Sequence, residues 1–290
     1  MPLFKRSAPL DGPAREVLGR VVSTPQFELI PLRNVEAQSL FLPAAATVTV
    51  TASPAKPIEA TVELSVRLAE RGFRVVPHLS ARMIHDRVHL RAILASLAAG
   101  GVERAFVVGG DAQEPGEFPD GLSLLRAMAE VGHGLSEIGI PGYPQGHPSI
   151  PDERLLTALA EKQPYATSMT TQLCFDPSAI WTWLSARRAE GISLPVNFGI
   201  PGVADLHKLI EISARIGVRD SGRFLSKNTA LVGRVLRPGG YRPDGLLAAL
   251  APLMLDPLAN VQGLHLYTFN QVETTEEWRQ AYLAGLAGLG

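Results

Sequence analysis

Two carboxylates lie where the sequence is otherwise apolar, and both could take part in acid–base or charge-stabilising chemistry. Glu28 is the one charged residue in the stretch FELIPL. A carboxylate buried there favours its protonated form, which is how a general acid arises near neutral pH. Asp111 follows two glycines in VVGGD, where the backbone can approach a ligand closely. The structural alternatives are a rim glutamate paired with an arginine and an ordinary turn aspartate.

Further polar residues lie within or after other apolar stretches. His78 in VVPHLS could face a ligand, or it could be a core histidine with satisfied hydrogen bonds. Gln172 is a polar side chain inside the strand-like stretch MTTQLCF, and His147 lies in a Gly/Pro-rich loop, where functional residues concentrate. The remaining candidates of this kind are Thr51, Gly110, Tyr143, Asn270 and Gln271.

Several other chemistries are disfavoured. Cys174 is the single cysteine, so it cannot form an internal disulfide or a cysteine-based metal centre, and we interpret it as a packing residue that faces the same way as Gln172. His85 and His89 have the i, i+4 spacing of a metal-binding pair but lack a third ligand, so no metal site is predicted. No Walker motif is present, and GLAGLG at the C-terminus follows no strand, unlike a dinucleotide-binding loop.

Composition and charge exclude further classes of protein. Of the 290 residues, 46% are hydrophobic and 19% are charged, which is enough apolar material for a full core. The net charge is -1 and no basic run alternates with aromatic residues, so no nucleic-acid partner is expected. The first residues lack the apolar segment of a secretory leader, and no apolar stretch reaches the roughly 20 residues needed to cross a bilayer, so we expect neither a leader nor a membrane span. We expect a soluble, cytoplasmic protein, with homo-oligomer formation left open.

A regular alternation of strands and helices must position these residues. Short β-rich runs predict strands at residues 27–32, 47–52, 73–79, 104–110, 135–143, 165–175, 194–200 and 263–269. Apolar residues three and four apart predict helices at residues 58–72, 86–101, 120–132, 152–162, 176–191, 203–217 and 274–288. We expect residues 1–25 to form an N-terminal arm with one short helix, and residues 218–262 to form an insertion with helices near 223–236 and 244–258.

Eight such units without a linker predict one α/β domain over residues 1–290, a (β/α)8 TIM barrel with extra helices before the last strand. The mostly continuous apolar strands are typical of parallel strands buried on both faces. An open doubly wound sheet is the alternative, although it normally has fewer strands. In a barrel, the active site lies at the carboxyl ends of the strands, where nearly all of the candidates fall.

Taken together, these residues resemble the methylenetetrahydrofolate reductase family. The resemblance extends from residue 27 to residue 270 and consists of short motifs in a common order. They are the Phe-Glu pair of the first strand, VTVT, the PHL motif at residues 77–79, Gly110-Asp111, Y-P-x-x-H-P at residues 143–148, TQLCFD at residues 171–176 and LYTFN at residues 266–270.

The resemblance implies a barrel that reduces the methylene bridge of 5,10-methylenetetrahydrofolate to a 5-methyl group, a step of one-carbon metabolism in methionine biosynthesis. Electrons come from a reduced nicotinamide, usually through bound FAD. Glu28 is implied to be the acid that assists opening of the imidazolidine ring. Asp111 is implied to hold the pterin and stabilise the iminium cation that accepts hydride, while Gln172 hydrogen-bonds the pterin.

The sequence also departs from the family pattern. FAD-using members carry an arginine before the Gly-Asp pair, where this chain has Gly109, and cations before the sixth strand, where it has Ala160 and Glu161. Loss of about three cations weakens binding of a pyrophosphate. After the last strand, the family's common Asn-Arg is Asn270-Gln271, which alters the implied substrate contacts.

These departures predict a flavin-independent reductase in which NADH occupies the flavin site and passes hydride directly to the substrate. The nicotinamide site would then be lined by Thr51, His78, Gly110, Tyr143 and His147. An FAD-dependent reductase, a related methylenetetrahydropterin reductase that uses a deazaflavin, and a folate-binding barrel without activity are the alternatives. No arginine for the extra phosphate of NADPH is identifiable, so the choice of nicotinamide stays open.

Overall fold

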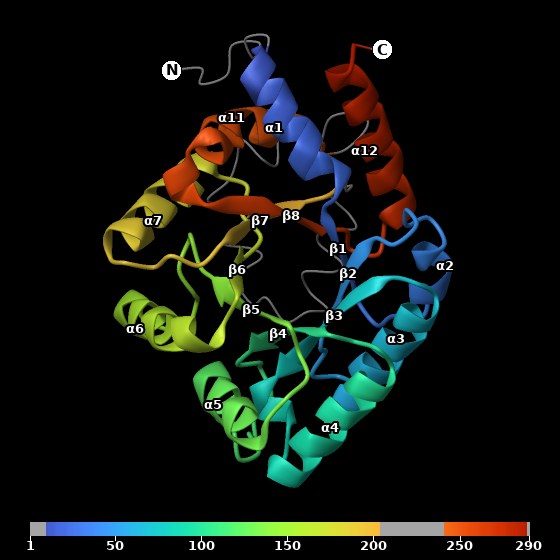
Figure 1. The fold of residues 1–290 in the computed structure, drawn as a ribbon, viewed down its shortest axis with the longest axis vertical. Coiled ribbons are helices and arrows are strands. Elements are labelled where there is room, and N and C mark those ends of the chain that lie inside the picture. Colours follow the sequence, from blue (N-terminus) through green and yellow to red (C-terminus); the bar gives the residue numbers. More distant parts are fainter. Residues whose placement is uncertain (1–9, 204–240, 289–290) are drawn as a thin grey trace.

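Eight parallel strands form a closed barrel in a computed structural model that describes residues 10–203 and 241–288. Each strand pairs with its neighbours in sequence, and β8 pairs with β1 to close the ring (Figure 1). The strands are β1 Gln26–Leu29, β2 Thr47–Val50, β3 Arg74–Ser80, β4 Arg104–Val108, β5 Glu137–Gly142, β6 Ser168–Thr171, β7 Val196–Pro201 and β8 Val261–Tyr267. The predicted barrel and its eight strands are therefore confirmed.

Helices surround the barrel, and most begin and end close to the predicted positions. They are α2 Val35–Ser39, α3 Ile58–Glu70, α4 Arg87–Ala99, α5 Gly121–Val131, α6 Asp152–Lys162, α7 Pro177–Ala189, α11 Asp244–Leu255 and α12 Val272–Leu286, with 3-10 turns η1 Ala81–Met83, η2 Gln163–Tyr165 and η3 Pro257–Ala259. The second helix predicted in the insertion is α11. The predicted helices at residues 203–217 and 223–236 lie outside the described residues.

Aspartate side chains cap the starts of several helices, including α4, α5 and α7. The Asp86 carboxylate accepts from the His89 N–H at 2.8 Å, and the Asp120 carboxylate accepts from the Ser123 N–H at 2.8 Å in a capping box. Asp176 accepts from the Ser178 N–H at 2.9 Å, with proline at the first helical position. Each cap satisfies a backbone donor that the first turn leaves free.

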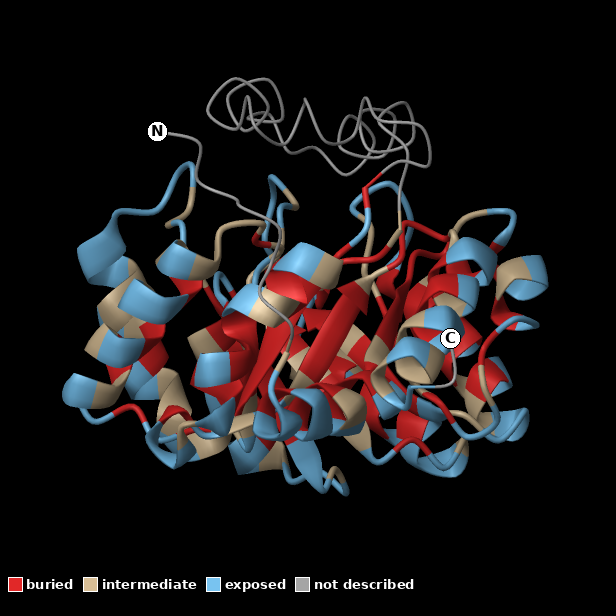
Figure 2. Cartoon of the chain, turned by 90° about the horizontal axis from the view of Figure 1, so that it is seen from above, coloured by how far each residue is buried: buried red, intermediate tan, exposed pale blue. Residues whose placement is uncertain are grey.

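Alternation along the strands separates an apolar outer surface from a polar interior, which we call the lumen. Phe27, Leu29, Val48 and Val50 are fully buried and belong to the core beneath the helices. Their neighbours Glu28 and Thr49 are paired in register and face inward, because successive side chains point to opposite faces. Figure 2 shows this buried layer of strands, with exposed residues on the outer faces of the helices.

The expected N-terminal arm contains α1 (Gly12–Ser23), which completes the outer ring. Figure 1 shows α1 between α11 and α12, and it packs against both helices and against β8. Its apolar side is buried through Ala14, Val17, Leu18, Val21 and Val22. The one short helix predicted here is confirmed, but its role in covering the barrel was not anticipated from the sequence.

Arg279 of α12 fixes the end of α1. Its guanidinium is 4% exposed and donates to the Val22 carbonyl at 3.1 Å and to the Ser23 carbonyl at 3.0 Å. The same guanidinium forms a two-pronged pair with the Glu276 carboxylate, at 2.6 and 2.7 Å. The buried Arg279 guanidinium therefore links α12 to the C-terminal end of α1.

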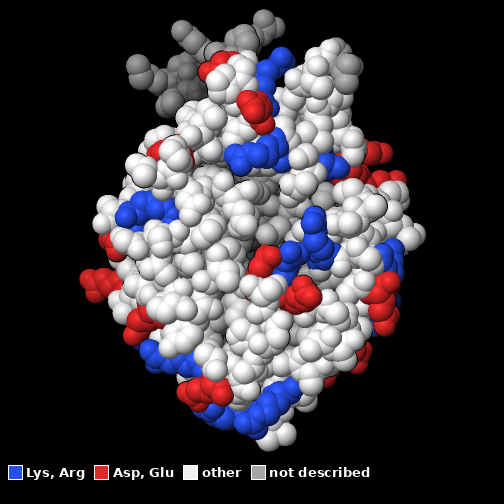
Figure 3. All heavy atoms as spheres, in the orientation of Figure 1, with Lys and Arg blue, Asp and Glu red and all other residues white. Residues whose placement is uncertain are grey.

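The charged surface contains both signs. On the face drawn in Figure 3, Lys and Arg side chains are interspersed with Asp and Glu side chains. None of the helices in the described residues combines the length and apolar character needed to cross a membrane.

Replacing Arg279 with alanine should lower the free energy of unfolding by about 3 kcal/mol, because it leaves the partly buried Glu276 carboxylate without its cation and two backbone carbonyls without their donor. Urea denaturation would measure the loss. Arg126→Ala is the matched control, since its 3.9 Å pair with Glu161 is half exposed and should contribute less than about 1 kcal/mol. Equal losses in the two variants would show that Arg279 does not anchor α1.

Candidate active site

A buried carboxylate–imidazole pair forms the centre of the candidate site. Glu28 in β1 is 6% exposed and His265 in β8 is 3% exposed, and Oε2 of the first lies 3.5 Å from Nε2 of the second. The pairing of β1 with β8 brings them together at the seam where the barrel closes. Because the partner is a lumen histidine, the alternative of a rim glutamate paired with arginine is wrong.

His78 faces the same part of the lumen from β3. Its ring lies 4.9 Å from that of Phe106, and burial together with the nearby His265 lowers the pKa of His78 to about 3. The imidazole is therefore neutral at physiological pH. Its Nε2 is buried and has no hydrogen-bond partner among the described residues, which separates it from an ordinary satisfied core histidine.

Tyr267 is stacked edge-on against His265, with ring centroids 4.7 Å apart. Its hydroxyl donates to the Thr171 carbonyl at 3.4 Å. Burial, followed by the charges of Glu28 and Tyr143, raises the pKa of Tyr267 well above 10, so the phenol stays protonated. Sequence reasoning missed both His265 and Tyr267 as site residues. The available signal was two ring-bearing polar residues two positions apart in the apolar strand GLHLYTF.

Three further candidates are grouped at the neighbouring strand ends. Tyr143 directly follows β5, and its ring meets that of His147 edge to face at 5.5 Å. Burial, with a smaller effect of the Asp111 charge, raises the pKa of Tyr143 to about 12. Burial lowers the pKa of His147, and the Asp111 charge partly opposes that shift. Asp111 itself is exposed to solvent.

Arg82 ties down the loop that carries Asp111. Its guanidinium donates to the Ala112 carbonyl at 2.5 Å and to the Gln113 carbonyl at 2.7 Å, and its backbone N–H donates to the Gly109 carbonyl at 3.0 Å. The turn itself requires glycine at position 110. There φ is +86°, and a Cβ would lie 1.8 Å from the Ser80 hydroxyl oxygen.

The remaining candidates have different environments. Gln172 lies just beyond β6, not inside a strand as predicted, and its backbone N–H donates to the Gly142 carbonyl at 2.7 Å. Its side chain is exposed, so it lies at the rim. Thr51 is half-buried one residue after β2, and its N–H donates to the Leu29 carbonyl at 3.0 Å.

Asn270 and Gln271 follow β8, and the Asn270 side chain helps to close the barrel. The Asn270 amide accepts from the Ile30 N–H and donates to the Ile30 carbonyl, both at 2.8 Å. Nearby, the Thr268 hydroxyl donates to the Glu28 carbonyl. Gln271 is half-buried at the start of α12, and its side chain makes no hydrogen bond within the described residues. Asn270 therefore continues the β1–β8 ladder beyond the strands.

The end of α6 carries few cations. Ala160 is exposed there, and Glu161 faces Arg126 at 3.9 Å. Lys162 lies against Gly121 at the start of α5, with its Cε 3.6 Å from the position of a Gly121 Cβ. Burial lowers the pKa of Lys162, and the nearby Asp120 charge partly opposes that shift.

Cys174 and His89, which the sequence analysis did not assign to a functional site, make structural contacts. Cys174 is 1% exposed and its Sγ donates to the Asp176 carbonyl at 3.4 Å, while burial raises its pKa to about 11. It is a packing residue, but it is buried whereas Gln172 is exposed, so the expectation that both face the same way is wrong. His89 uses both ring nitrogens, with the His85 N–H at 3.1 Å and the Glu59 carboxylate at 2.9 Å.

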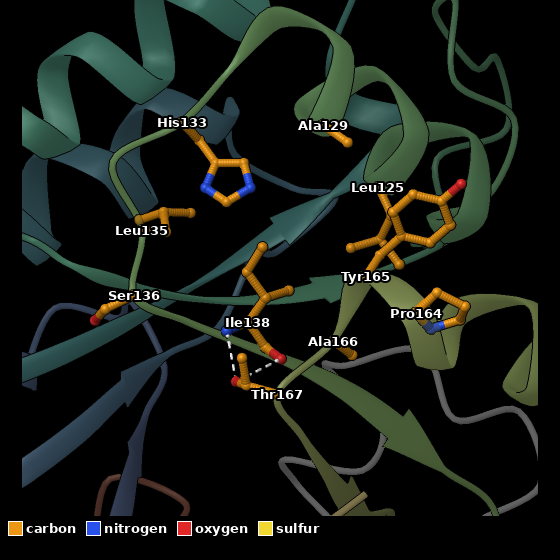
Figure 4. A pocket seen from close by; sticks show the side chains of 10 residues that line it. All are labelled: Leu125, Ala129, His133, Leu135, Ser136, Ile138, Pro164, Tyr165, Ala166 and Thr167. Carbon is orange, nitrogen blue, oxygen red and sulfur yellow. Dashed lines mark hydrogen bonds between the residues drawn. The ribbon is translucent and has the colours of Figure 1, made fainter.

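A small hollow of about 260 Å³ lies apart from these residues. Figure 4 shows it on the outside of the barrel, with His133, Tyr165 and Thr167 among its lining residues. Thr167 precedes β6, and its hydroxyl accepts from the Ile138 N–H at 2.9 Å. The hollow is therefore next to the starts of β5 and β6, away from the strand ends where the candidates are grouped.

The fold and the grouped strand-end residues define the class of a (β/α)8-barrel enzyme with its site at the carboxyl ends of the strands. The family model for methylenetetrahydrofolate reductase matches residues 32–221. The chain therefore belongs to the methylenetetrahydrofolate reductase family, and it is an oxidoreductase that acts on methylenetetrahydrofolate.

The solved structures that align with this chain share little sequence with it. A provisionally assigned lyase/mutase from Burkholderia cenocepacia J2315 is 13% identical, with 94% of this chain and 87% of that chain covered and a TM-score of 0.48. An oxaloacetate acetylhydrolase is 12% identical, with 81% and 92% covered and a TM-score of 0.45. A provisionally assigned phosphonomutase from B. cenocepacia J2315 is 16% identical, with 77% and 99% covered and a TM-score of 0.44.

Gly110→Ala should reduce both stability and kcat/KM, because the new Cβ must displace Ser80 or the Asp111 turn. Gly72→Ala is the matched control: its φ is +88°, yet a Cβ there meets no atom within 4 Å. Left-handed strain alone costs about 1–2 kcal/mol, so Gly72→Ala should lose that much stability and keep its activity. Thermal unfolding and steady-state kinetics would measure both. Similar behaviour of the two variants would remove the steric role assigned to Gly110.

Proposed function

We propose that this protein reduces 5,10-methylenetetrahydrofolate to 5-methyltetrahydrofolate by hydride transfer directly from NADH, with Glu28 as general acid. The membership of the family supports the reaction, and the buried Glu28–His265 pair is the observation that supports the acid role. A carboxyl group away from water, beside a group that can return its proton, suits general acid catalysis.

Glu28 protonates the substrate so that the five-membered ring opens and leaves an iminium cation at the one-carbon unit. The side chain is well placed for this step, since it lies in the lumen below the strand ends and is held on one side by His265. The Nε2 of His265, at 3.5 Å, can donate a proton to the carboxylate after turnover. Neutral Tyr267 packs edge-on against His265, and its hydroxyl is held by the Thr171 carbonyl.

Asp111 holds the pterin and stabilises the cation by its charge. Its exposure suits that role, because the carboxylate is accessible to a bound pterin at the rim, whereas Glu28 is shielded. Gln172 at the rim hydrogen-bonds the pterin edge. Asn270 and Gln271 line the substrate side of the mouth, where Asn270 acts through the position of the Ile30 backbone that it holds.

A reduced nicotinamide supplies the hydride when it is bound. Thr51, His78, Gly110, Tyr143 and His147 would hold it. The neutral His78 and the crossed rings of Tyr143 and His147 suit a flat, weakly charged ring.

Bound FAD fits the described residues less well. FAD-using members of the family carry cations at the end of this helix and before the Gly-Asp turn, but here α6 ends with Ala160 and Glu161, and Gly109 adds no charge. Lys162 is the observation that favours the alternative of an FAD enzyme, because it lies close to the start of α5. Its neighbour Asp120 offsets that charge.

Oxidation of NADH dependent on methylenetetrahydrofolate, by protein shown to be free of flavin, tests the proposal. Turnover without added FAD is expected, with 5-methyltetrahydrofolate as product. A stoichiometric flavin released from the purified, denatured protein would contradict direct transfer. Turnover only after FAD is added would keep the reaction and reject the flavin-independent route. Activity only with a deazaflavin and another pterin would reject the substrate assignment.

Glu28→Gln should still bind methylenetetrahydrofolate but lose a factor of at least about 10² in kcat, because the amide cannot donate the proton needed for ring opening. Glu63→Gln is the control, since Glu63 is an exposed residue of α3. Stopped-flow oxidation of NADH and substrate binding by fluorescence would separate rate from affinity. A rate close to that of the unmodified protein would remove Glu28 from the acid role.

A further inference from the structure

Most of the buried polar atoms that lack a partner in the described residues face the lumen. They are Thr49 Oγ1, His78 Nε2, Ser80 Oγ, Arg104 Nε and Asn197 Nδ2, while Thr275 Oγ1 and Tyr282 Oη lie in α12 on the outside. His265 Nε2 also makes no hydrogen bond, and its contact is the 3.5 Å pair with Glu28. A buried donor or acceptor without a partner destabilises the fold, and internal water normally satisfies it. The clustering therefore points to water inside the barrel.

The register places these atoms at different depths along the lumen. Arg104 lies at the start of β4, where its guanidinium pairs with the half-exposed Glu137 carboxylate at 2.8 Å. Asn197 is the second residue of β7 and pairs with Thr170 and Gly263. His265 lies two residues after Gly263 in β8. The polar atoms thus extend from the amino-terminal mouth of the barrel up to the Glu28–His265 pair.

Asn197 is built into this interior. The β7–β8 ladder shifts register between Val196 and Asn197, and a Cβ on the facing Gly263 would come within 3.2 Å of Asn197 Oδ1. The glycine and the irregularity together make room for an amide where a small barrel normally packs aliphatic side chains. The side chain is 3% exposed, so bulk solvent does not account for its free Nδ2.

The two ring nitrogens of His265 face different partners. Its Nδ1 lies 3.5 Å from the Gln26 amide oxygen, on the side of the partly exposed Gln26, and its Nε2 lies 3.5 Å from Glu28. An imidazole can accept a proton at one nitrogen while it releases one from the other. The two nitrogens therefore separate a solvent side from a substrate side.

We propose that the proton consumed in the reaction reaches Glu28 through the lumen, from the amino-terminal mouth of the barrel, over waters held by Arg104, Asn197 and Thr49 and then through His265. The inference rests on the proposed function. In each turnover Glu28 gives one proton to the leaving ring nitrogen, and hydride passes from the nicotinamide to the one-carbon unit. A proton from solvent then restores Glu28, and the substrate and nicotinamide cover the opposite, carboxyl-end side.

Thr49→Val and Thr275→Val form a matched pair that tests the route. Both threonines are at most 1% exposed and have an unpartnered hydroxyl, but Thr49 faces the lumen and Thr275 lies in α12. Thr49→Val and the more obstructive Asn197→Leu should lower kcat by at least about fivefold with little change in KM. They should also raise the solvent deuterium isotope effect on kcat, and a small weak acid such as imidazolium should restore part of the rate.

Thr275→Val should leave the rate and the isotope effect unchanged. Thermal unfolding identifies variants that fail to fold. If Asn197→Leu does not fold, Thr49→Val still tests the route, because valine has nearly the same shape as threonine. Wild-type turnover with unchanged kcat and isotope effect in Thr49→Val would overturn the lumen route alone. Failure of the wild-type protein to oxidise NADH with methylenetetrahydrofolate would overturn the proposed function, and the route with it.

Discussion

Closure of the barrel between β1 and β8 is the constraint on which the site depends. Two backbone register pairs define the seam, and side chains extend it: the Thr268 hydroxyl donates to the Glu28 carbonyl, and the Asn270 amide makes two bonds to Ile30. Without this seam, Glu28 would lie on an open sheet edge in contact with water. With it, the carboxylate is enclosed and meets His265 from the far end of the chain.

Burial then gives the ionisable groups of the site distinct states. It lowers the pKa of His78 to about 3 and raises that of Tyr267 well above 10, so both rings are neutral. The two carboxylates differ in burial, since Glu28 is enclosed in the lumen and Asp111 is exposed at its rim.

Local patterns in the sequence predicted most of the fold but only part of the site. Strands and helices depend on neighbours in the chain, so apolar periodicity was sufficient for them. The contact of Glu28 with His265 depends on the register across the closing seam, which no local pattern specifies. Gln172 was assigned to a strand because its neighbours are apolar, yet β6 ends at Thr171 and the side chain emerges at the rim.

The position of α1 has a consequence for how the protein is made. This helix is synthesised before α11 and α12, whose surfaces bury its apolar side. Arg279, which fixes the end of α1, is also a late residue. A nascent chain therefore exposes the Val17–Leu18–Val21 stripe until α11 and α12 have been synthesised, so it offers chaperones a binding segment until the barrel closes.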